Sequence, residues 1–223
     1  MSVSHALVVN VLKGLTGLIC RIDDQELKRV PRQGPLIIYT NHVNILEIPI
    51  IYTHLQPRLV RGMLLAERWE IPVVGWGLDV TRTIPLHRGE ADLPAMRMGL
   101  EALENGEILI VAPEGTRSHD GKLQPAHPGV VLLALHSLAP LLPVAFYGAE
   151  NYSVNLRRLR RTDFHLRVGK PFHLETHGEK VTHAVRQAMV EELMYQLALV
   201  LPPEYRGAYA NGTATSTRYL DTE

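Results

Sequence analysis

Hydrophobic residues recur at spacings of three and four along residues 6–20, 90–105 and 178–200. This spacing is the period of an amphipathic α-helix, which buries one apolar face. A glycine directly follows the second segment and is typical of a helix C-terminal cap. The sequence therefore predicts helices over these three segments, and shorter apolar helices over residues 45–55 and 128–138.

Short apolar runs, bounded by proline, glycine or polar residues, alternate with these helices. Runs of about four to eight residues are typical of buried β-strands. Strands that alternate with helices predict an α/β fold, with a mostly parallel central sheet flanked by helices. In such a sheet, functional residues gather at the carboxyl ends of the strands. The runs are "PLIIYT", "RLVRGML", "EILIVA", "LLPVAFYG" and "DFHLRVGK".

The chain has 223 residues, a length that suits one domain with short extensions. We expect residues 1–30 to contain an N-terminal amphipathic helix that is a candidate for membrane contact. Residues 31–203 are expected to form the domain itself. Residues 204–223 show no sustained period, so they are predicted to be a mobile tail.

The apolar face of the first predicted helix has two interpretations, packing on the core or lying in the surface of a membrane. The polar face has few lysines or arginines, which favours the core, whereas a lipid substrate would favour the membrane. The segment is too short and too interrupted to span a bilayer, which needs about twenty apolar residues. The N-terminus also lacks the features of a signal peptide. The predicted face consists of Val8, Val11, Leu12, Leu15, Leu18 and Ile19.

Composition and motifs argue against several classes of protein, although they leave room for local basic patches. Lys+Arg and Asp+Glu balance at 23 each, without the basic excess of a nucleic-acid-binding protein. The single cysteine, Cys20, cannot form an intramolecular disulfide, and its place at the end of an apolar pattern favours packing over catalysis. The sequence contains no Gly-x-Ser-x-Gly or His-Glu-x-x-His motif, which argues against a serine esterase and a helical zinc site.

The polar residues "TNH" follow the run "PLIIY", and Glu47 comes five residues after His42. Residues five apart point about 140° apart on a continuous helix, so these side chains meet only if His42 precedes the helix and Glu47 begins it. A carboxylate bonded to one ring nitrogen fixes the tautomer and leaves the other nitrogen free as a base. Alternatively, Asn41 caps the helix and His42 is an ordinary turn residue.

A second polar cluster, "PEGTRS", follows the run "EILIVA". Gly115 permits a tight turn and close approach of the backbone to a ligand. Arg117 could hold a phosphate with two hydrogen bonds, and Glu114 could accept one from a substrate hydroxyl or an arginine. The alternative is an ordinary turn with a surface ion pair, which contributes little to stability.

Four motifs, in this order, resemble those of the glycerolipid acyltransferases typified by 1-acylglycerol-3-phosphate acyltransferase (lysophosphatidic acid acyltransferase). They are "NHVNILE", "TIPLHR", "PEGTRS" and "LLPVA", within roughly residues 35–150. The family has Asn-His-x4-Asp, Gly-x-Ile/Phe-x-x-Arg, Pro-Glu-Gly-Thr-Arg-Ser and an apolar block ending in Pro-Val. The first and third motifs are specific when they occur together about seventy residues apart.

The resemblance implies phospholipid biosynthesis, with a fatty acyl group moved from acyl-CoA or acyl carrier protein to the hydroxyl of a lysophospholipid or glycerol phosphate. His42 would be the general base and Glu47 would orient it. No metal, cofactor or covalent acyl-enzyme is implied. A peripheral position on the cytoplasmic face of a membrane would suit the lipid acceptor. The residues expected to bind substrate are Asn41, Arg88, Glu114, Gly115, Thr116 and Arg117.

The sequence departs from the family pattern at two positions. Glu47 stands where the family has Asp, and its additional methylene lengthens the arm that must reach His42. His127 precedes Gly129 where the family often has a lysine, and a neutral histidine is a weaker phosphate partner. Lys122 could take that lysine's place. The second departure leaves open an acyltransferase with a non-phosphate acceptor.

A non-catalytic protein that binds lipid or docks on a membrane is the main alternative from another class. It would keep an apolar groove and the N-terminal helix but would not need His42. The geometry of His42 and Glu47 distinguishes the two hypotheses, because an unpaired and buried His42 would favour the non-catalytic protein.

Overall fold

The protein is described by a computed structural model that covers residues 3–87, 92–211 and 216–221. Within these residues a seven-stranded sheet has the order β1-β7-β6-β2-β5-β3-β4, and a small two-stranded sheet pairs β8 with β9. The strands are β1 (Cys20–Asp23), β2 (Leu36–Tyr39), β3 (Val60–Leu65), β4 (Ile84–Leu86), β5 (Ile108–Val111), β6 (Leu141–Tyr147), β7 (Thr162–Val168), β8 (His173–Leu174) and β9 (Leu220–Asp221).

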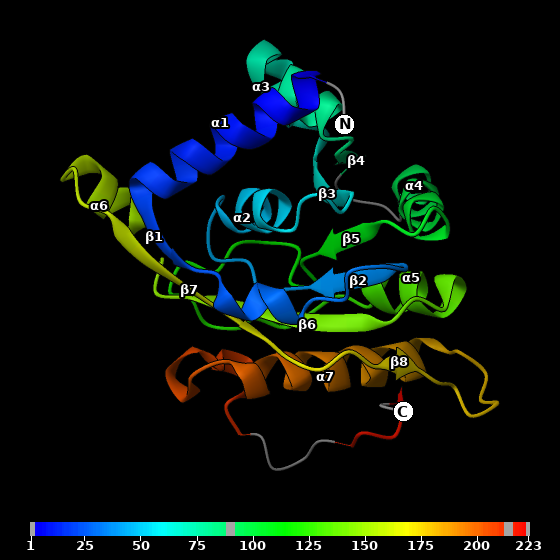
Figure 1. Ribbon diagram of the computed structural model, residues 1–223. Coiled ribbons are helices and arrows are strands. Elements are labelled where there is room, and N and C mark those ends of the chain that lie inside the picture. The colour runs from blue at the N-terminus through cyan, green and yellow to red at the C-terminus, as the bar shows by residue number, and fades with distance from the viewer. Residues whose placement is uncertain (1–2, 88–91, 212–215, 222–223) are drawn as a thin grey trace.

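Helices cover both faces of the large sheet (Figure 1). The α-helices are α1 (Val3–Ile19), α2 (Glu47–His54), α3 (Pro72–Val80), α4 (Leu93–Glu104), α5 (Gly129–Ser137), α6 (Tyr152–Arg157) and α7 (His183–Val200). Short 3₁₀ helices span η1 (Gln25–Arg29), η2 (Ala66–Glu70), η3 (Pro203–Tyr205) and η4 (Gly207–Tyr209). Strands β6, β2, β5, β3 and β4 run parallel, whereas β7 runs antiparallel to β6 and pairs in parallel with β1. The predicted α/β fold with a mostly parallel, helix-covered sheet is therefore confirmed.

Alternate residues of the central strand β2 face two separate hydrophobic cores. Ile37 and Tyr39 pack with α4, α5 and α7, while Leu36 and Ile38 pack with α1 and α2. This division follows from the pleat of a strand, which points successive side chains to opposite faces. The strand that carries "TNH" is thus held rigidly from both sides.

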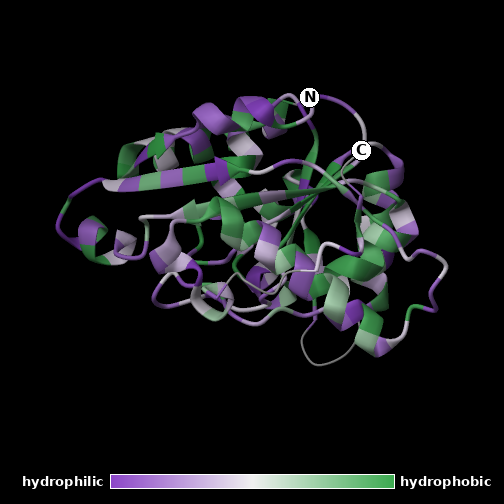
Figure 2. Ribbon diagram, turned by 90° about the horizontal axis from the view of Figure 1, so that it is seen from below, coloured by the Kyte–Doolittle hydropathy of each residue, from purple (hydrophilic) through white to green (hydrophobic). Residues whose placement is uncertain are grey.

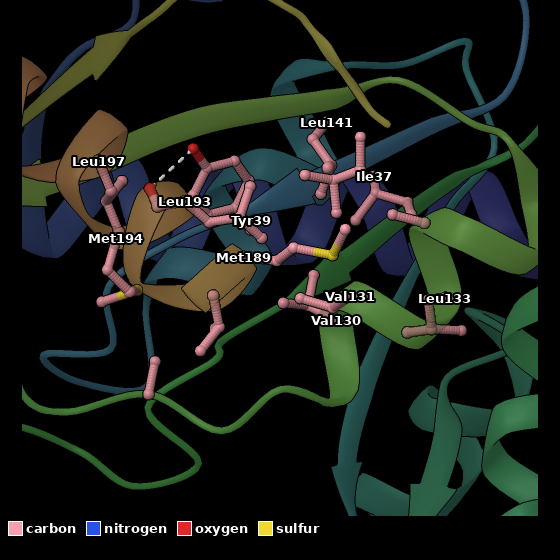
Figure 3. Packing of buried hydrophobic residues seen from close by; sticks show 14 of the residues in the cluster. Ile37, Tyr39, Val130, Val131, Leu133, Leu141, Met189, Leu193, Met194 and Leu197 are labelled. Carbon is pink, nitrogen blue, oxygen red and sulfur yellow. Dashed lines mark hydrogen bonds between the residues drawn. The ribbon is translucent and has the colours of Figure 1, made fainter. Parts of the chain in front are cut away.

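Helix α7 packs its predicted apolar face on the sheet (Figure 3). Met189, Leu193 and Leu197 are fully buried there, and the Tyr39 hydroxyl donates a 3.0 Å hydrogen bond to the Leu193 carbonyl. The helix begins after Thr182, whose side-chain oxygen accepts from Val185 N, and so it is shorter at its start than the sequence predicts.

Several short elements have no counterpart in the sequence-based prediction, among them β1, β4, α3 and α6. Strand β4 has only three residues and β1 contains the charged residues Arg21 and Asp23, so neither forms the longer apolar run that predicted the other strands. Helix α3 contains Gly75 and Gly77, which weaken a helical pattern. Gly75 is required there, because a Cβ atom at this position would lie 2.9 Å from the Trp69 carbonyl oxygen.

Helix α1 crosses α2 and contributes to the core through Val8 and Val9. The predicted single apolar face is divided in the structure, because Val8 is buried whereas Val11, Leu15 and Leu18 are exposed. Among the described residues, no helix combines the length and the apolar character that a membrane span requires.

The described part of residues 204–223 differs from the predicted mobile tail. It forms η4 and strand β9, and the side chains of Tyr209 and Tyr219 are buried against the domain. Backbone hydrogen bonds join Leu123 N to Tyr205 O at 3.0 Å and Ala208 N to Leu123 O at 3.0 Å. Two separated tyrosines anchor this segment without producing a sequence period.

Candidate active site

The two polar motifs predicted from the sequence lie side by side at the carboxyl edge of the sheet. Strands β2 and β5 are parallel neighbours, with Tyr39 in register with Val111. Thr40 extends the ladder by donating a 3.0 Å hydrogen bond from its backbone N–H to Val111 O. The chain after each strand therefore turns at the same place, which brings His42 close to Glu114.

His42 and Glu47 have the relationship that the sequence required for them to meet. His42 precedes α2, and Glu47 is the first residue of that helix. The ring Nδ1 of His42 lies 3.3 Å from Glu47 Oε2, and the His42 side chain is 26% exposed while that of Glu47 is 1% exposed. His42 is thus paired on one side and accessible from solvent.

Glu47 is held in place by the backbone of the turn that precedes it. Its Oε1 accepts hydrogen bonds from the backbone N–H groups of Val43 at 3.1 Å and Asn44 at 2.6 Å. The N-terminus of α2 adds the positive end of the helix dipole, which favours a carboxylate at this position. One oxygen of Glu47 therefore fixes the carboxylate, and the other is left to orient the imidazole ring.

Glu114 lies on the other side of His42 and is 2% exposed. Its Oε1 accepts the backbone N–H of His42 at 3.0 Å, and its Oε2 accepts the backbone N–H of Gln124 at 3.1 Å. Burial raises the pKa of Glu114 to about 7, although these two backbone hydrogen bonds oppose the rise. Glu114 was expected to contact substrate, but its oxygens are instead occupied by two segments of the protein's own backbone.

The turn after β5 also holds the carbonyl of His42, which accepts a 2.7 Å hydrogen bond from the backbone N–H of Ser118. Gly115 within this turn has φ of +65°, and a Cβ atom there would approach the His127 ring at 3.2 Å. The N–H of Gly115 donates to Ala112 O at 3.1 Å, and that of His42 donates to Glu114. These amides are candidates for binding a negatively charged oxygen of the substrate, because they lie beside His42, but both already have protein acceptors in this structure.

Asn41 was expected to bind substrate, but its side chain joins two strands. Its Nδ2 donates to Phe146 O at 2.8 Å and its Oδ1 accepts from Phe146 N at 2.8 Å, and the residue is 1% exposed. The adjacent Asn44 acts similarly by donating from Nδ2 to Ala149 O at 3.1 Å. From sequence alone, an asparagine that bridges two strands cannot be distinguished from one that binds substrate, because both follow a buried strand.

The remaining predicted residues are placed differently. Thr116 and Arg117 are exposed on the turn that holds His42, and His127 is exposed beside the same turn. Lys122 forms an ion pair with Asp120 at 3.8 Å. Arg88 falls outside the described residues. Gln124 and Ser118, which support Glu114 and His42, were missed because neither residue type is diagnostic by itself.

Two other features are separate from this site. A cavity of about 570 Å³ lies near the starts of β3 and β4, where Arg61, Arg82 and Trp69 line it. Several of its polar groups have protein partners, including the 2.5 Å pair of Arg61 with Glu107 and the bond from Trp69 Nε1 to Asp79.

His173 and His177 have the spacing of helical metal ligands, but His173 belongs to strand β8 and His177 has φ of +49°. Across the described parts of the chain, no group of three or more potential metal ligands is found.

Comparisons with known proteins agree with the resemblance seen in the motifs. The profile of the family named Acyltransferase matches residues 21–147, which contain both His42 and the turn after β5. A chloroplastic 1-acyl-sn-glycerol-3-phosphate acyltransferase of Brassica napus is 28% identical over 57% of this chain and 38% of its own length. A lyso-ornithine lipid O-acyltransferase of Pseudomonas aeruginosa is 26% identical over 80% of this chain and 74% of its own.

The fold is shared with a solved structure, that of the 1-acyl-sn-glycerophosphate acyltransferase PlsC from Thermotoga maritima. The two have a TM-score of 0.64 at 23% identity, covering 85% of this chain and 76% of the other. The chain spans only 38% of the Brassica napus relative's length. Because the family profile covers more than half of the sequence, including its two specific motifs, this chain belongs to the acyltransferase family.

Proposed function

We propose that the protein is an O-acyltransferase that moves a fatty acyl group from acyl-CoA or acyl carrier protein to the hydroxyl of a lysophospholipid or glycerol phosphate. The observation that carries the proposal is the pairing of the accessible His42 ring with the buried carboxylate of Glu47. Family membership and the names of its relatives support the reaction class.

His42 acts as the general base in this proposal. With Nδ1–H donated to Glu47, the lone pair on Nε2 takes the proton of the acceptor hydroxyl as its oxygen attacks the thioester carbonyl. The tetrahedral intermediate then collapses with cleavage of the carbon–sulfur bond. The imidazolium returns its proton to the departing thiolate, so that an ester and a free thiol are the products.

Glu114 is a positioning residue in this mechanism. Its hydrogen bond to the His42 backbone, with that from Ser118 to the His42 carbonyl, fixes the main chain at both sides of the catalytic side chain. Proton transfer needs the base within about 3 Å of the hydroxyl, so this double attachment lowers the entropy lost on reaching that geometry.

The acceptor is proposed to bind beside the exposed turn that carries Thr116 and Arg117. The guanidinium of Arg117 suits a phosphate, and the sequence motif adds Arg88. A second acceptor class is an amino-acid-containing lipid, since one relative is named for lyso-ornithine lipid acylation and His127 replaces the usual lysine. The non-catalytic hypothesis would have been favoured by an unpaired and buried His42, whereas His42 is paired with Glu47 and partly exposed.

The proposed location is the cytoplasmic face of a membrane, with the protein bound peripherally. Helix α1 exposes an apolar stripe, here called the α1 stripe, and contacts α3, which exposes Val73, Val74 and Trp76. Exposed apolar side chains of adjacent helices are typical of a surface that enters the lipid interface. The α1 stripe consists of Val3, Leu7, Val11, Leu15 and Leu18.

The experiment that tests this function measures thiol release from acyl-CoA or acyl carrier protein with different acceptors. The panel contains lysophosphatidic acid, glycerol 3-phosphate, lyso-ornithine lipid and no acceptor. Release that depends on one acceptor supports the proposal and names the acceptor class. Release without any acceptor would instead indicate a thioesterase, and no release with either donor would contradict the proposal.

A further inference from the structure

A concentrated basic segment joins α6 to β7. Residues 156–161 have the sequence LRRLRR, here called the basic turn, although the whole chain has a net charge of zero. Figure 1 shows α6 and this turn at the left edge of the molecule, beside the C-terminal end of α1. In Figure 2 the same region stands out from the body of the protein, with strongly hydrophilic residues at its edge.

The backbone of the basic turn is well ordered by local hydrogen bonds. The N–H of Leu159 donates to Leu156 O at 3.0 Å, and that of Arg160 donates to Asn155 O at 2.8 Å. The side chain of Asn155 donates to the Thr162 hydroxyl at 3.1 Å, which ties the turn to the start of β7. The turn therefore presents its side chains from a defined backbone conformation.

Leu159 occupies a position where a leucine does not help the protein to fold. It is 94% exposed, and its φ of +52° lies in the left-handed region, where glycine is the usual residue after a helix. Leu156 and Val154 are also exposed nearby. Because its side chain contributes little to the core, Leu159 is available for a contact outside the protein, and the neighbouring arginines distinguish it from other exposed leucines.

The charges of the turn divide into one structural arginine and three available ones. Arg161 donates to the carbonyls of Gly17 at 2.7 Å and Cys20 at 2.5 Å, which attaches the turn to the C-terminal end of α1. Arg157, Arg158 and Arg160 are exposed and form no ion pair with any residue that the structure describes. The available charges thus adjoin the helix that carries the α1 stripe.

We propose that the basic turn is a second membrane contact, which binds an anionic lipid surface through its arginines and inserts Leu156 and Leu159 between the headgroups. Arginines at the level of lipid phosphates, interleaved with apolar side chains that reach the acyl chains, form a pattern that suits the membrane interface. Attachment to α1 favours a lipid surface over an acidic protein partner, because it holds the basic turn beside the end of the helix that carries the α1 stripe. The inference rests on the interfacial position proposed above.

The test measures binding of the full chain to vesicles of phosphatidylcholine alone and to vesicles that also contain phosphatidylglycerol. Replacing Arg157, Arg158 and Arg160 by glutamine removes three charges without touching the site of His42. We expect this variant to lose roughly a hundredfold in affinity for the anionic vesicles, and much less for the neutral ones. The matched control, Arg32→Gln, Arg97→Gln and Lys170→Gln, removes the same charge from exposed positions elsewhere and should bind as the wild type does.

A second pair of variants tests the leucine. Leu138 has the same left-handed backbone, with φ of +54°, and is 75% exposed, but it ends α5 at the opposite edge of the sheet. Leu159→Gly and Leu138→Gly both relieve backbone strain, so neither should lower the melting temperature. Only Leu159→Gly is expected to weaken vesicle binding, by several-fold.

Equal binding of all variants to anionic vesicles would overturn the role of the basic turn. If the arginine variant instead keeps vesicle binding but loses rate only with an acyl carrier protein donor, the turn binds that protein and the proposal is wrong. If the wild-type protein binds neither kind of vesicle, the proposed position at the membrane surface is wrong as well. Thiol release with soluble substrates, measured in parallel, shows whether the proposed acyl transfer survives in each case.

Discussion

Glu114 accepts the backbone N–H of His42 at 3.0 Å, from a turn seventy-two positions later in the chain. Glu47 meanwhile contacts the ring of the same histidine at 3.3 Å. Two buried acids thus act on one residue, one through the main chain and one through the side chain. This arrangement separates the placement of the candidate base from the choice of its tautomer, and the two can be tested independently.

Replacing Glu47 by glutamine tests the choice of tautomer. The glutamine oxygen can keep the N–H groups of Val43 and Asn44, which leaves its NH₂ facing His42 Nδ1. The ring then carries its proton on Nε2 and cannot act as a base. We expect the transfer rate to fall by roughly 10²–10⁴-fold with a small change in melting temperature. A rate within a few-fold of wild type would remove Glu47 from the mechanism.

The pH dependence of stability tests the burial of Glu114. Its pKa is raised from 4.5 to about 7, so between these values the folded protein holds a proton that the unfolded chain has released. The contribution of Glu114 to the free energy of unfolding is therefore fully present below about pH 4.5. It declines as the pH rises to 7, by roughly 3 kcal/mol at most.

The measurement for Glu114 compares urea unfolding of wild type and Glu114→Gln at pH 5 and pH 8. Glutamine does not titrate. The unfolding free energy of wild type minus that of Glu114→Gln should therefore be smaller at pH 8 than at pH 5. A difference that is independent of pH would show that Glu114 is ionised throughout this range.

Asn41→Ala tests whether this residue binds substrate or joins strands. The substitution leaves both backbone groups of Phe146 without their partners in a buried position. Each unsatisfied group destabilises by about 1–3 kcal/mol, so we expect a loss of about 3 kcal/mol in the free energy of unfolding. Thr116→Ala, on the exposed turn, should change stability little. An unchanged stability for Asn41→Ala together with a raised acceptor KM would restore its predicted binding role.

The α1 stripe predicts a specific effect on membrane binding. Leu7→Gln and Leu15→Gln, combined in one chain, place amides where two exposed leucines would enter the lipid. We expect partition into vesicles to fall at least about tenfold without a change in fold. The control is Leu199→Gln, an equally exposed leucine on α7, which covers the other face of the sheet. An equal loss in the control would refute a specific stripe.

Much of the fold follows from period and order along the chain, because the long helices and buried strands bury regular apolar faces. Helices α4 and α7 and strands β2, β5 and β6 lie where the sequence predicts them, to within a few residues. The reversal of β7 could not be predicted, since an antiparallel neighbour of β6 has the same alternation as a parallel one. The C-terminal segment was missed because only Tyr209 and Tyr219 anchor it.

At the site, sequence reasoning stated the condition under which His42 and Glu47 meet, and the start of α2 fulfils it. It did not separate residues that face substrate from residues that satisfy the backbone. Asn41 and Glu114 have the chemistry of binding groups, yet buried backbone N–H and C=O groups compete for the same atoms. That competition depends on loops brought together by the sheet.

The most direct test of the central claim is acceptor-dependent thiol release by His42→Ala, measured against wild type and against His136→Ala, an exposed histidine on α5. The account predicts that His42→Ala keeps the wild-type melting temperature and loses roughly 10²–10⁴-fold in rate, while His136→Ala keeps both. Transfer by a folded His42→Ala protein at a rate close to that of wild type would contradict the assignment of His42 as the base.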